Sequence, residues 1–167
     1  MKNTAFDRKP QEDSGSKSSY SSESFYKTYW RQHRLLIVDD EPDILDELSA
    51  YLSHKGFLCE TAADGREAMK KANDIEDIAI ILTDIRMPGL DGLDLARNLL
   101  ESASKAERDI EVIMLTGHAG IDEAIEALQV GASDFLTKPI SLDDLMETVR
   151  QADHAIRMRR LNHHYRR

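Results

Sequence analysis

Short apolar runs alternate with stretches of helical periodicity from Arg34 to the end of the chain. The continuous apolarity of the runs, without polar residues in alternation, is typical of strands that are buried on both faces of a parallel sheet. We therefore expect five such strands, which are LLIV (35–38), FLC (57–59), IAIIL (78–82), VIML (112–115) and DFLT (134–137).

Four amphipathic segments separate these strands and a fifth follows the last one. The first and fourth stop at Gly56 and Gly131, which suit left-handed C-caps, and the last begins at Ser141 with Asp144 three residues later, as in a capping box. The apolar face expected for the fourth comprises Ile121, Ala124, Ile125 and Leu128. Strict alternation of strands and helices predicts an α/β fold, a doubly wound (βα)5 five-stranded parallel sheet with the flavodoxin-like order 2-1-3-4-5.

The 167 residues suffice for about one domain, and their charge is unevenly distributed. Residues 1–30 carry a net charge of +1, residues 155–167 carry +5, and the stretch between them carries -15. Such an acidic body repels phosphate backbones, so we expect no direct nucleic-acid binding by this domain. The longest purely apolar run, 78–82, has five residues against about 20 for a membrane span, so we expect no membrane segment and a cytoplasmic protein.

The composition divides the chain into three segments. Residues 1–30 form an expected disordered tail, since residues 14–24 include seven Ser, and the tail ends in an aromatic cluster, Phe25, Tyr26, Tyr29 and Trp30. The cluster either packs on its own domain, which we favour, or docks a partner. The folded domain is expected over 31–155, and 156–167 is read as a basic helix end or a linker. The single cysteine, Cys59, is expected to pack in a buried strand and excludes an internal disulfide.

Polar residues stand at the carboxyl ends of four of the five expected strands. Asp39 and Asp40 follow the first strand, Asp84 the third, Thr116 the fourth and Lys138 the fifth. In this strand order the first and third strands are neighbours, so three carboxylates converge, which favours a hard cation such as Mg²⁺. An acidic cluster with a hydroxyl and a lysine beside it indicates phosphoryl chemistry with Asp84 as the nucleophile.

Four motifs at these strand ends resemble the CheY-like receiver domain of bacterial two-component response regulators. They are LLIVDDEPD (35–43), LTDIRMPGLDG (82–92), MLTGHAG (114–120) and GASDFLTKP (131–139). The likeness covers about residues 34–155. It implies a phosphorelay protein in which Asp84 accepts a phosphoryl group from a sensor histidine kinase or a phosphotransfer protein.

The resemblance also implies roles around this acceptor. Asp39, Asp40 and Asp84 would hold Mg²⁺ or Mn²⁺ together with the backbone carbonyl of Arg86. Thr116 would bond a phosphoryl oxygen.

The resemblance implies further roles for residues on and after the third, fourth and fifth strands. Lys138 would pair with Asp84 before and after transfer, and its bond to Pro139 would be cis. Phe135 matches an aromatic switch position, and because it lacks a hydroxyl its switching would rest on packing. Arg86 and His118 stand where the family tunes phosphoryl loss, although His118 can equally be an exposed loop residue.

The expected output is a surface made by the fourth helix, the fifth strand and the fifth helix, which is acidic and suits a homodimer or a basic protein partner. A complete chain of this length would be a single-domain regulator, whereas a truncated one would be the receiver of a longer transcriptional or enzymatic regulator. Two rival functions are an aspartyl phosphohydrolase and a phosphorylation-independent adaptor. The hydrolase would need an acid two residues past Asp84, where Arg86 stands, so we expect a switch and not a turnover enzyme.

Overall fold

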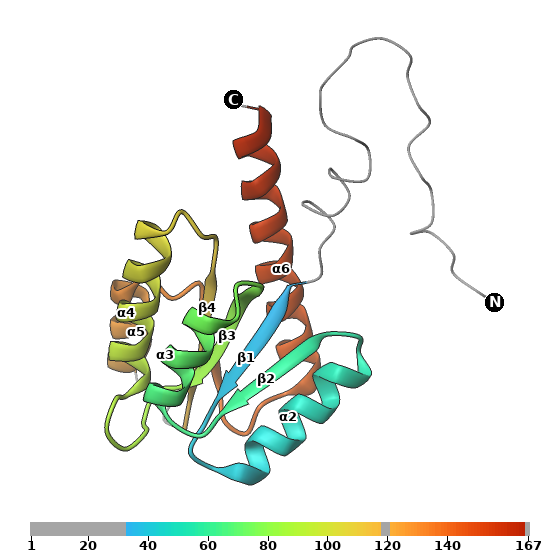
Figure 1. Cartoon of the computed structure of the whole chain (residues 1–167). Coiled ribbons are helices and arrows are strands. Elements are labelled where there is room, and N and C mark those ends of the chain that lie inside the picture. Colours follow the sequence, from blue (N-terminus) through green and yellow to red (C-terminus); the bar gives the residue numbers. More distant parts are fainter. Residues whose placement is uncertain (1–32, 118–120, 166–167) are drawn as a thin grey trace, which may run out of the picture.

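The computed structural model describes residues 33–117 and 121–165 of the chain, which form one five-stranded parallel sheet with helices on both faces (Figure 1). The strands are β1 (Arg34–Val38), β2 (Leu58–Ala62), β3 (Ile78–Asp84), β4 (Glu111–Thr116) and β5 (Asp134–Thr137). The helices are α2 (Pro42–His54), α3 (Gly65–Asp74), α4 (Gly92–Lys105), α5 (Ile121–Val130) and α6 (Leu142–Tyr165). The strand order is β2-β1-β3-β4-β5, so the predicted fold class and strand order are confirmed.

Two layers of helices cover the sheet. Apolar side chains of α2 and α6 form one core cluster with one face of the strands, and those of α3, α4 and α5 form a second cluster with the other face (Figure 1). β3 and β4 are buried along their whole length and β1 along all but its first residue. The three central strands therefore form the rigid platform on which the strand ends are placed.

The two edge strands differ from the prediction. β2 runs from Leu58 to Ala62, whereas we expected 57–59. Of its residues only Ala62 is buried, and β5 alternates between partly buried and exposed residues. The prediction of burial on both faces is wrong for these two strands because each has a neighbour on one side only. Cys59 is accordingly half-buried, although it still contacts the α2 and α6 core cluster.

The helix ends follow the sequence, but the packing face of α5 does not. Gly56 and Gly131 both adopt a φ of +94°, the left-handed conformation expected of their caps. On α5, however, Ile125 and Leu128 are 46% and 60% exposed, while Ala127 is 1% exposed. The prediction that Ile125 and Leu128 face the core is wrong, because α5 turns its small residues toward the sheet.

Helix α6 is the longest helix described and projects past the end of the sheet at which the strands begin (Figure 1). It starts next to Ser141, whose hydroxyl accepts a hydrogen bond from the backbone N–H of Asp144 at 3.3 Å, as the capping pattern predicts. The helix continues across residue 155, and Ile156 is completely buried. In the part of the chain that the structure describes, neither α6 nor any other helix has the length and apolarity needed to cross a membrane.

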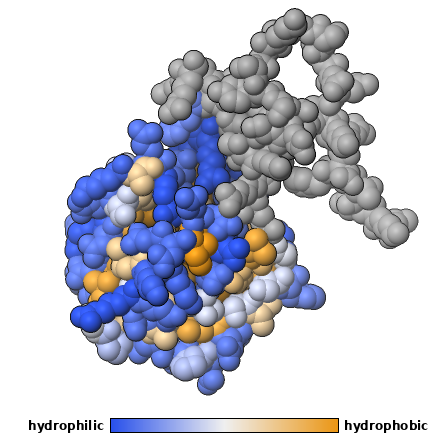
Figure 2. All heavy atoms as spheres, viewed as in Figure 1, coloured by the Kyte–Doolittle hydropathy of each residue, from blue (hydrophilic) through white to orange (hydrophobic). Residues whose placement is uncertain are grey.

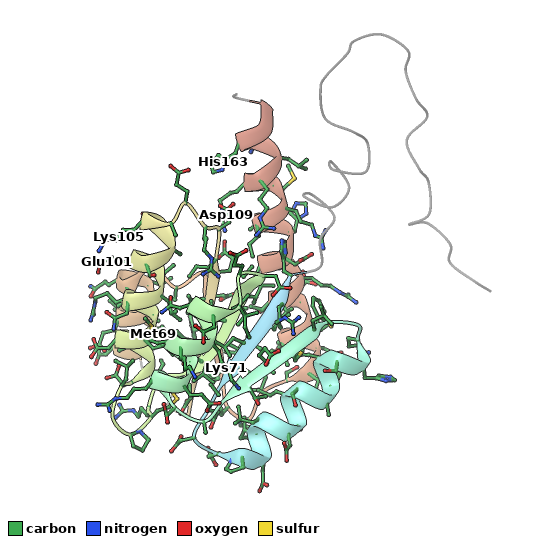
Figure 3. All side chains as sticks on the ribbon, in the orientation of Figure 1. Met69, Lys71, Glu101, Lys105, Asp109 and His163 are labelled. Carbon is green, nitrogen blue, oxygen red and sulfur yellow. The ribbon has the colours of Figure 1, made fainter. Side chains whose placement is uncertain are left out.

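Ion pairs hold the C-terminal half of α6 against the sheet. Arg159 contacts Asp109, at 3.2 Å, and Glu111 at the start of β4, and Figure 3 shows Asp109 in the connection that faces α6. Within the helix, Arg157 binds Asp153, which is also the partner of His33, at 2.7 Å. These arginines of the basic helix end are therefore partnered by carboxylates of the domain itself.

His33 and Asp153 join the entry of β1 to the middle of α6. The His33 ring is 3% exposed, and its Nδ1 lies 2.6 Å from Oδ1 of Asp153. Burial by itself would raise the pKa of Asp153, but the hydrogen bonds from His33 and Arg157 outweigh it and hold the pKa below its ordinary value. Ionised Asp153 therefore stabilises the fold.

A close backbone approach positions the connection after β3. A Cβ added to Gly92 would lie 2.0 Å from the carbonyl oxygen of Asp84, and the Gly92 N–H donates to the carbonyl of Ile85 at 2.9 Å. Only a residue without a side chain lets the first turn of α4 come this close to the end of β3. Gly92 thereby sets the path of the loop that follows Asp84.

Asp153→Asn is expected to lower the free energy of unfolding by about 1–3 kcal/mol at neutral pH, because it replaces a charge-assisted acceptor that is largely buried. A lowered carboxyl pKa contributes stability above about pH 4 and loses it as pH falls through the folded-state pKa, so the difference from wild type should shrink toward pH 3. Urea titrations at several pH values measure this. The exposed Glu101→Gln, which breaks a pair with Lys105, should change stability little. An undiminished difference at pH 3 would contradict the assignment.

Gly92→Ala is expected to destabilise the fold by about 3 kcal/mol, because the new methyl group meets backbone atoms that cannot move away independently. The matched control is Gly117→Ala, since an added Cβ there meets nothing within 4 Å. Urea unfolding of both variants tests the contrast, and equal stability of the two would show that the loop after β3 relaxes freely.

Candidate functional site

Backbone hydrogen bonds tie the carboxyl ends of the strands into one rim. The N–H of Lys138 donates to the carbonyl of Thr116 at 2.7 Å, and the N–H of Ile85 donates to that of Leu115 at 2.9 Å. The N–H of Asp39 donates to the carbonyl of Ala62 at 3.2 Å. Side chains that follow β1, β3 and β5 therefore start from neighbouring points.

Three carboxylates gather at this rim. One oxygen from each of Asp39, Asp40 and Asp84 lies within 4.8 Å of the other two. Asp39 is 0% and Asp84 7% exposed, whereas Asp40 is open to solvent. The cluster is thus buried on the side of the strand ends and open to solvent at Asp40, where a ligand can enter.

Lys138 is the cation of the cluster. Its Nζ lies 2.7 Å from Oδ2 of Asp39, 3.5 Å from Oδ1 of Asp84 and 3.5 Å from Oε1 of Glu41. Burial would lower the pKa of this ammonium, but the hydrogen bond to Asp39 and the charges of Asp39, Asp84 and Glu41 raise it above its usual value. Lys138 is therefore protonated at neutral pH and ion-paired with all three carboxylates.

For Asp84, burial outweighs the stabilising effect of the nearby cation on the charged form. Burial raises the pKa of its carboxyl group, Lys138 counteracts this, and the charges of Asp39 and Asp40 raise it further, so the net pKa lies above the ordinary value. Lys138 alone therefore leaves the negative charge of ionised Asp84 incompletely compensated.

The donor set fits a small hard cation. It consists of oxygen atoms only. Two oxygen ligands of one such ion are at most about 4–5 Å apart, and these carboxylate oxygens all lie within 4.8 Å of one another. One or two carboxylates supplemented by waters and a phosphate oxygen are the usual environment of Mg²⁺. Asp39, Asp40 and Asp84 are thus suitable to hold Mg²⁺ or Mn²⁺.

The remaining predicted residues surround this cluster at different depths. Thr116 is 4% exposed at the end of β4, whereas Phe135 is 38% exposed on β5. The Lys138–Pro139 peptide bond is cis. Arg86 is exposed and lines an open hollow of about 580 Å³ beside Asp40, and His118 lies outside the described residues.

Two residues of the site lie within the sequence motifs, but the sequence analysis assigned them no role. Glu41 follows the two acids of the first motif and contacts Lys138, and its own N–H donates to Oδ1 of Asp39 at 2.9 Å. Gly92 stands at the end of the second motif, and its requirement for a bare Cα becomes visible only in the close approach to Asp84.

Comparison with known proteins agrees with this geometry. Residues 35–150 match the family described as "Response regulator receiver domain". Among solved structures, the fold is similar to a response regulator receiver domain protein from Clostridium thermocellum, with a TM-score of 0.68, 31% identity and coverage of 74% of this chain and 95% of that one. It is also similar to the chemotaxis protein CheY4 of Vibrio cholerae, with a TM-score of 0.66, 31% identity and coverage of 72% and 98%.

Curated relatives are longer than this chain. The C4-dicarboxylate transport transcriptional regulatory protein DctD of Pseudomonas aeruginosa is 36% identical over 121 residues, which are 72% of this chain and 25% of DctD. The transcriptional regulatory protein PrrA of Mycobacterium leprae is 37% identical over 117 residues, which are 70% of this chain and 48% of PrrA. The chain therefore spans a quarter to about half of these relatives.

Both relatives are named as transcriptional regulatory proteins, and these names do not support our expectation of no direct nucleic-acid binding. That expectation rests on the charge of the acidic domain alone. The family match covers most of the chain, and the solved receiver domains share its fold over nearly their whole length. The chain belongs to the response regulator receiver domain family.

Proposed function

We propose that Asp84 is the phosphoryl acceptor of this receiver domain and that the donor is a phosphohistidine of a sensor histidine kinase or phosphotransfer protein. The observation that carries the proposal is the convergence of a nearly buried Asp84 with Asp39, Asp40 and Lys138. A carboxylate oxygen of Asp84 forms a bond to phosphorus while the P–N bond to the imidazole breaks. The bonding electron pair stays on the ring nitrogen, so the donor histidine returns to its unphosphorylated form.

Each neighbour has a distinct task. Asp39, Asp40 and Asp84 would hold Mg²⁺ or Mn²⁺ with the backbone carbonyl of Arg86, and the ion would neutralise charge on the phosphoryl oxygens. Lys138 pairs with Asp39 at 2.7 Å and needs to move little to reach an oxygen on Asp84, which is now 3.5 Å away. Burial leaves the Asp84 carboxylate poorly solvated, which favours its use as a nucleophile once a cation compensates the cluster.

The switch would pass from Thr116 to Phe135. In the proposed sequence of events, the Thr116 hydroxyl turns to a phosphoryl oxygen, and the ring of Phe135, now 38% exposed, moves into the space that is vacated. Phe135 has no hydroxyl, so its inward position would be held by packing alone. Arg86 and His118 would tune the loss of the phosphoryl group.

The readout would be the face formed by α5, β5 and α6. Large apolar side chains are exposed there among carboxylates, and they are Ile125, Leu128, Phe135 and Leu142. Such a mixture suits a second copy of the domain or a protein partner with a basic, partly apolar surface. Since the chain spans a quarter to about half of the transcriptional regulators it resembles, a receiver segment of a longer regulator is the second candidate.

A switch, and not a turnover enzyme, is the activity that the site supports. A hydrolase that releases phosphate from an external substrate would need an acidic residue two positions after Asp84 to activate water. Arg86 occupies that position. The complete set of Asp84, Thr116 and Lys138 favours phosphorylation over a phosphorylation-independent adaptor. A pull-down with and without a beryllofluoride phosphoryl mimic separates the two, since an adaptor would bind its partner equally in both.

Asp84→Asn is expected to abolish labelling by a small phosphodonor in the presence of Mg²⁺, because the amide removes the nucleophilic oxygen and one metal ligand. A phosphate-affinity gel measures the labelled fraction. Asp46→Asn, at an exposed position of α2, is the matched control and should be labelled like the wild type. Undiminished labelling of Asp84→Asn would refute the assignment of the acceptor.

Without divalent metal, Asp84→Asn is expected to raise the midpoint of thermal unfolding at neutral pH. A carboxyl group whose folded-state pKa is raised binds more protons when folded, so its ionisation costs stability as pH rises, and the gain should disappear below about pH 4. Mg²⁺ should raise the midpoint of the wild type more than that of the variant. Scanning calorimetry at several pH values, with Asp46→Asn as control, measures both effects, and equal responses to Mg²⁺ would exclude Asp84 as a ligand.

A further inference from the structure

The outward face of the C-terminal half of α6 carries apolar side chains. Met158 is 43% exposed, and Leu161, three residues on and thus on the same side of the helix, is half-buried. Met158 is two residues from the completely buried Ile156, so it lies about 200° around the helix from that core contact. This Met158–Leu161 face is therefore directed away from the sheet.

The described part of the chain begins beside α6. His33 is buried against Asp153 of that helix, so the point at which residues 1–32 join the domain lies next to α6. Met158 and Leu161 are about 7 and 12 Å further along the helix axis than Asp153 and about 140° and 80° around it. Eight residues of extended chain reach about 27 Å, so both positions are within reach of a segment that starts at residue 25.

Residues 25–30 have the chemistry to cover this face. They contain four of the ten aromatic residues of the chain, Phe25, Tyr26, Tyr29 and Trp30. Aromatic rings and a flexible methionine make favourable contacts, and a tether of a few residues gives an effective concentration of about millimolar. We propose that the segment Phe25–Trp30 docks on the Met158–Leu161 face of α6 in its own chain, independently of the phosphorylation site.

Other exposed apolar residues are placed less favourably. Leu58, although paired in register with Arg34, precedes Cys59, which points into the α2 and α6 core cluster, so Leu58 points to the opposite face of the sheet. Ile125 and Leu128 are carried by α5, which also covers that opposite face. The His33 ring, by contrast, faces Asp153 on the α6 side of the sheet.

The docked segment would control what α6 can contact. A second copy of the domain or a partner helix would have to displace Trp30 and its neighbours before it could pack on Met158.

The test uses the full chain and its single tryptophan, Trp30, as the reporter. In the wild type we expect a blue-shifted emission and protection from acrylamide quenching, both independent of protein concentration. Met158→Glu should shift the ratio of docked to undocked segment by roughly tenfold or more toward the undocked form, with red-shifted emission and stronger quenching. Leu58→Glu, which alters an equally exposed leucine on the other face, should leave Trp30 protected.

Circular dichroism checks that the variants are folded, and Met158→Gln replaces Met158→Glu if the charged variant is not. Quenching of wild-type Trp30 equal to that of free tryptophan amide would overturn the proposal. So would protection that survives the Met158 substitution or is lost equally in Leu58→Glu. Protection that disappears on dilution would assign the face to a second copy instead.

Discussion

Lys138 is the common counterion of acids that arrive from β1 and β3, and the rest of the site depends on this shared contact. Its Nζ is 2.7 Å from Asp39 and 3.5 Å from Asp84, and its backbone N–H is bonded to Thr116. Two poorly solvated carboxylates repel each other, so the site is stable only while a cation lies between them. The same charge balance leaves room for a divalent ion on the open side, where Asp40 meets solvent.

At the end of the sheet where the strands begin, ion pairs anchor α6. There His33 and Arg157 bind Asp153, and Arg159 binds Glu111 at the start of β4. Helix α6 runs from β5 at the site edge to this anchor (Figure 1). A displacement of Phe135 would therefore act on the first turns of α6 while its later turns stay fixed to the sheet, which confines the response to the face with α5.

Helix α5 shows why local periodicity did not predict its packing. Large apolar residues on one side and small ones on another give the helix two apolar faces, and periodicity favours the face with the larger side chains. The structure buries Ala127 and leaves Ile125 and Leu128 exposed, because a close approach between helix and sheet needs small side chains. In the space-filling view, apolar side chains form small groups among hydrophilic ones (Figure 2), so surface apolarity by itself does not reveal a partner.

The approximate positions of the strands, the helix caps at Gly56 and Gly131, and the residue types at the strand ends could be predicted from sequence, because each depends on residues close together in the chain. The order of the strands then brings Asp39 and Asp84 together without further information. Only the tertiary structure decided that Lys138 prefers Asp39, and that His33 meets Asp153, 120 residues away. Such contacts depend on how whole helices and strands dock, and docking is determined by the summed packing of many side chains, to which no single motif corresponds.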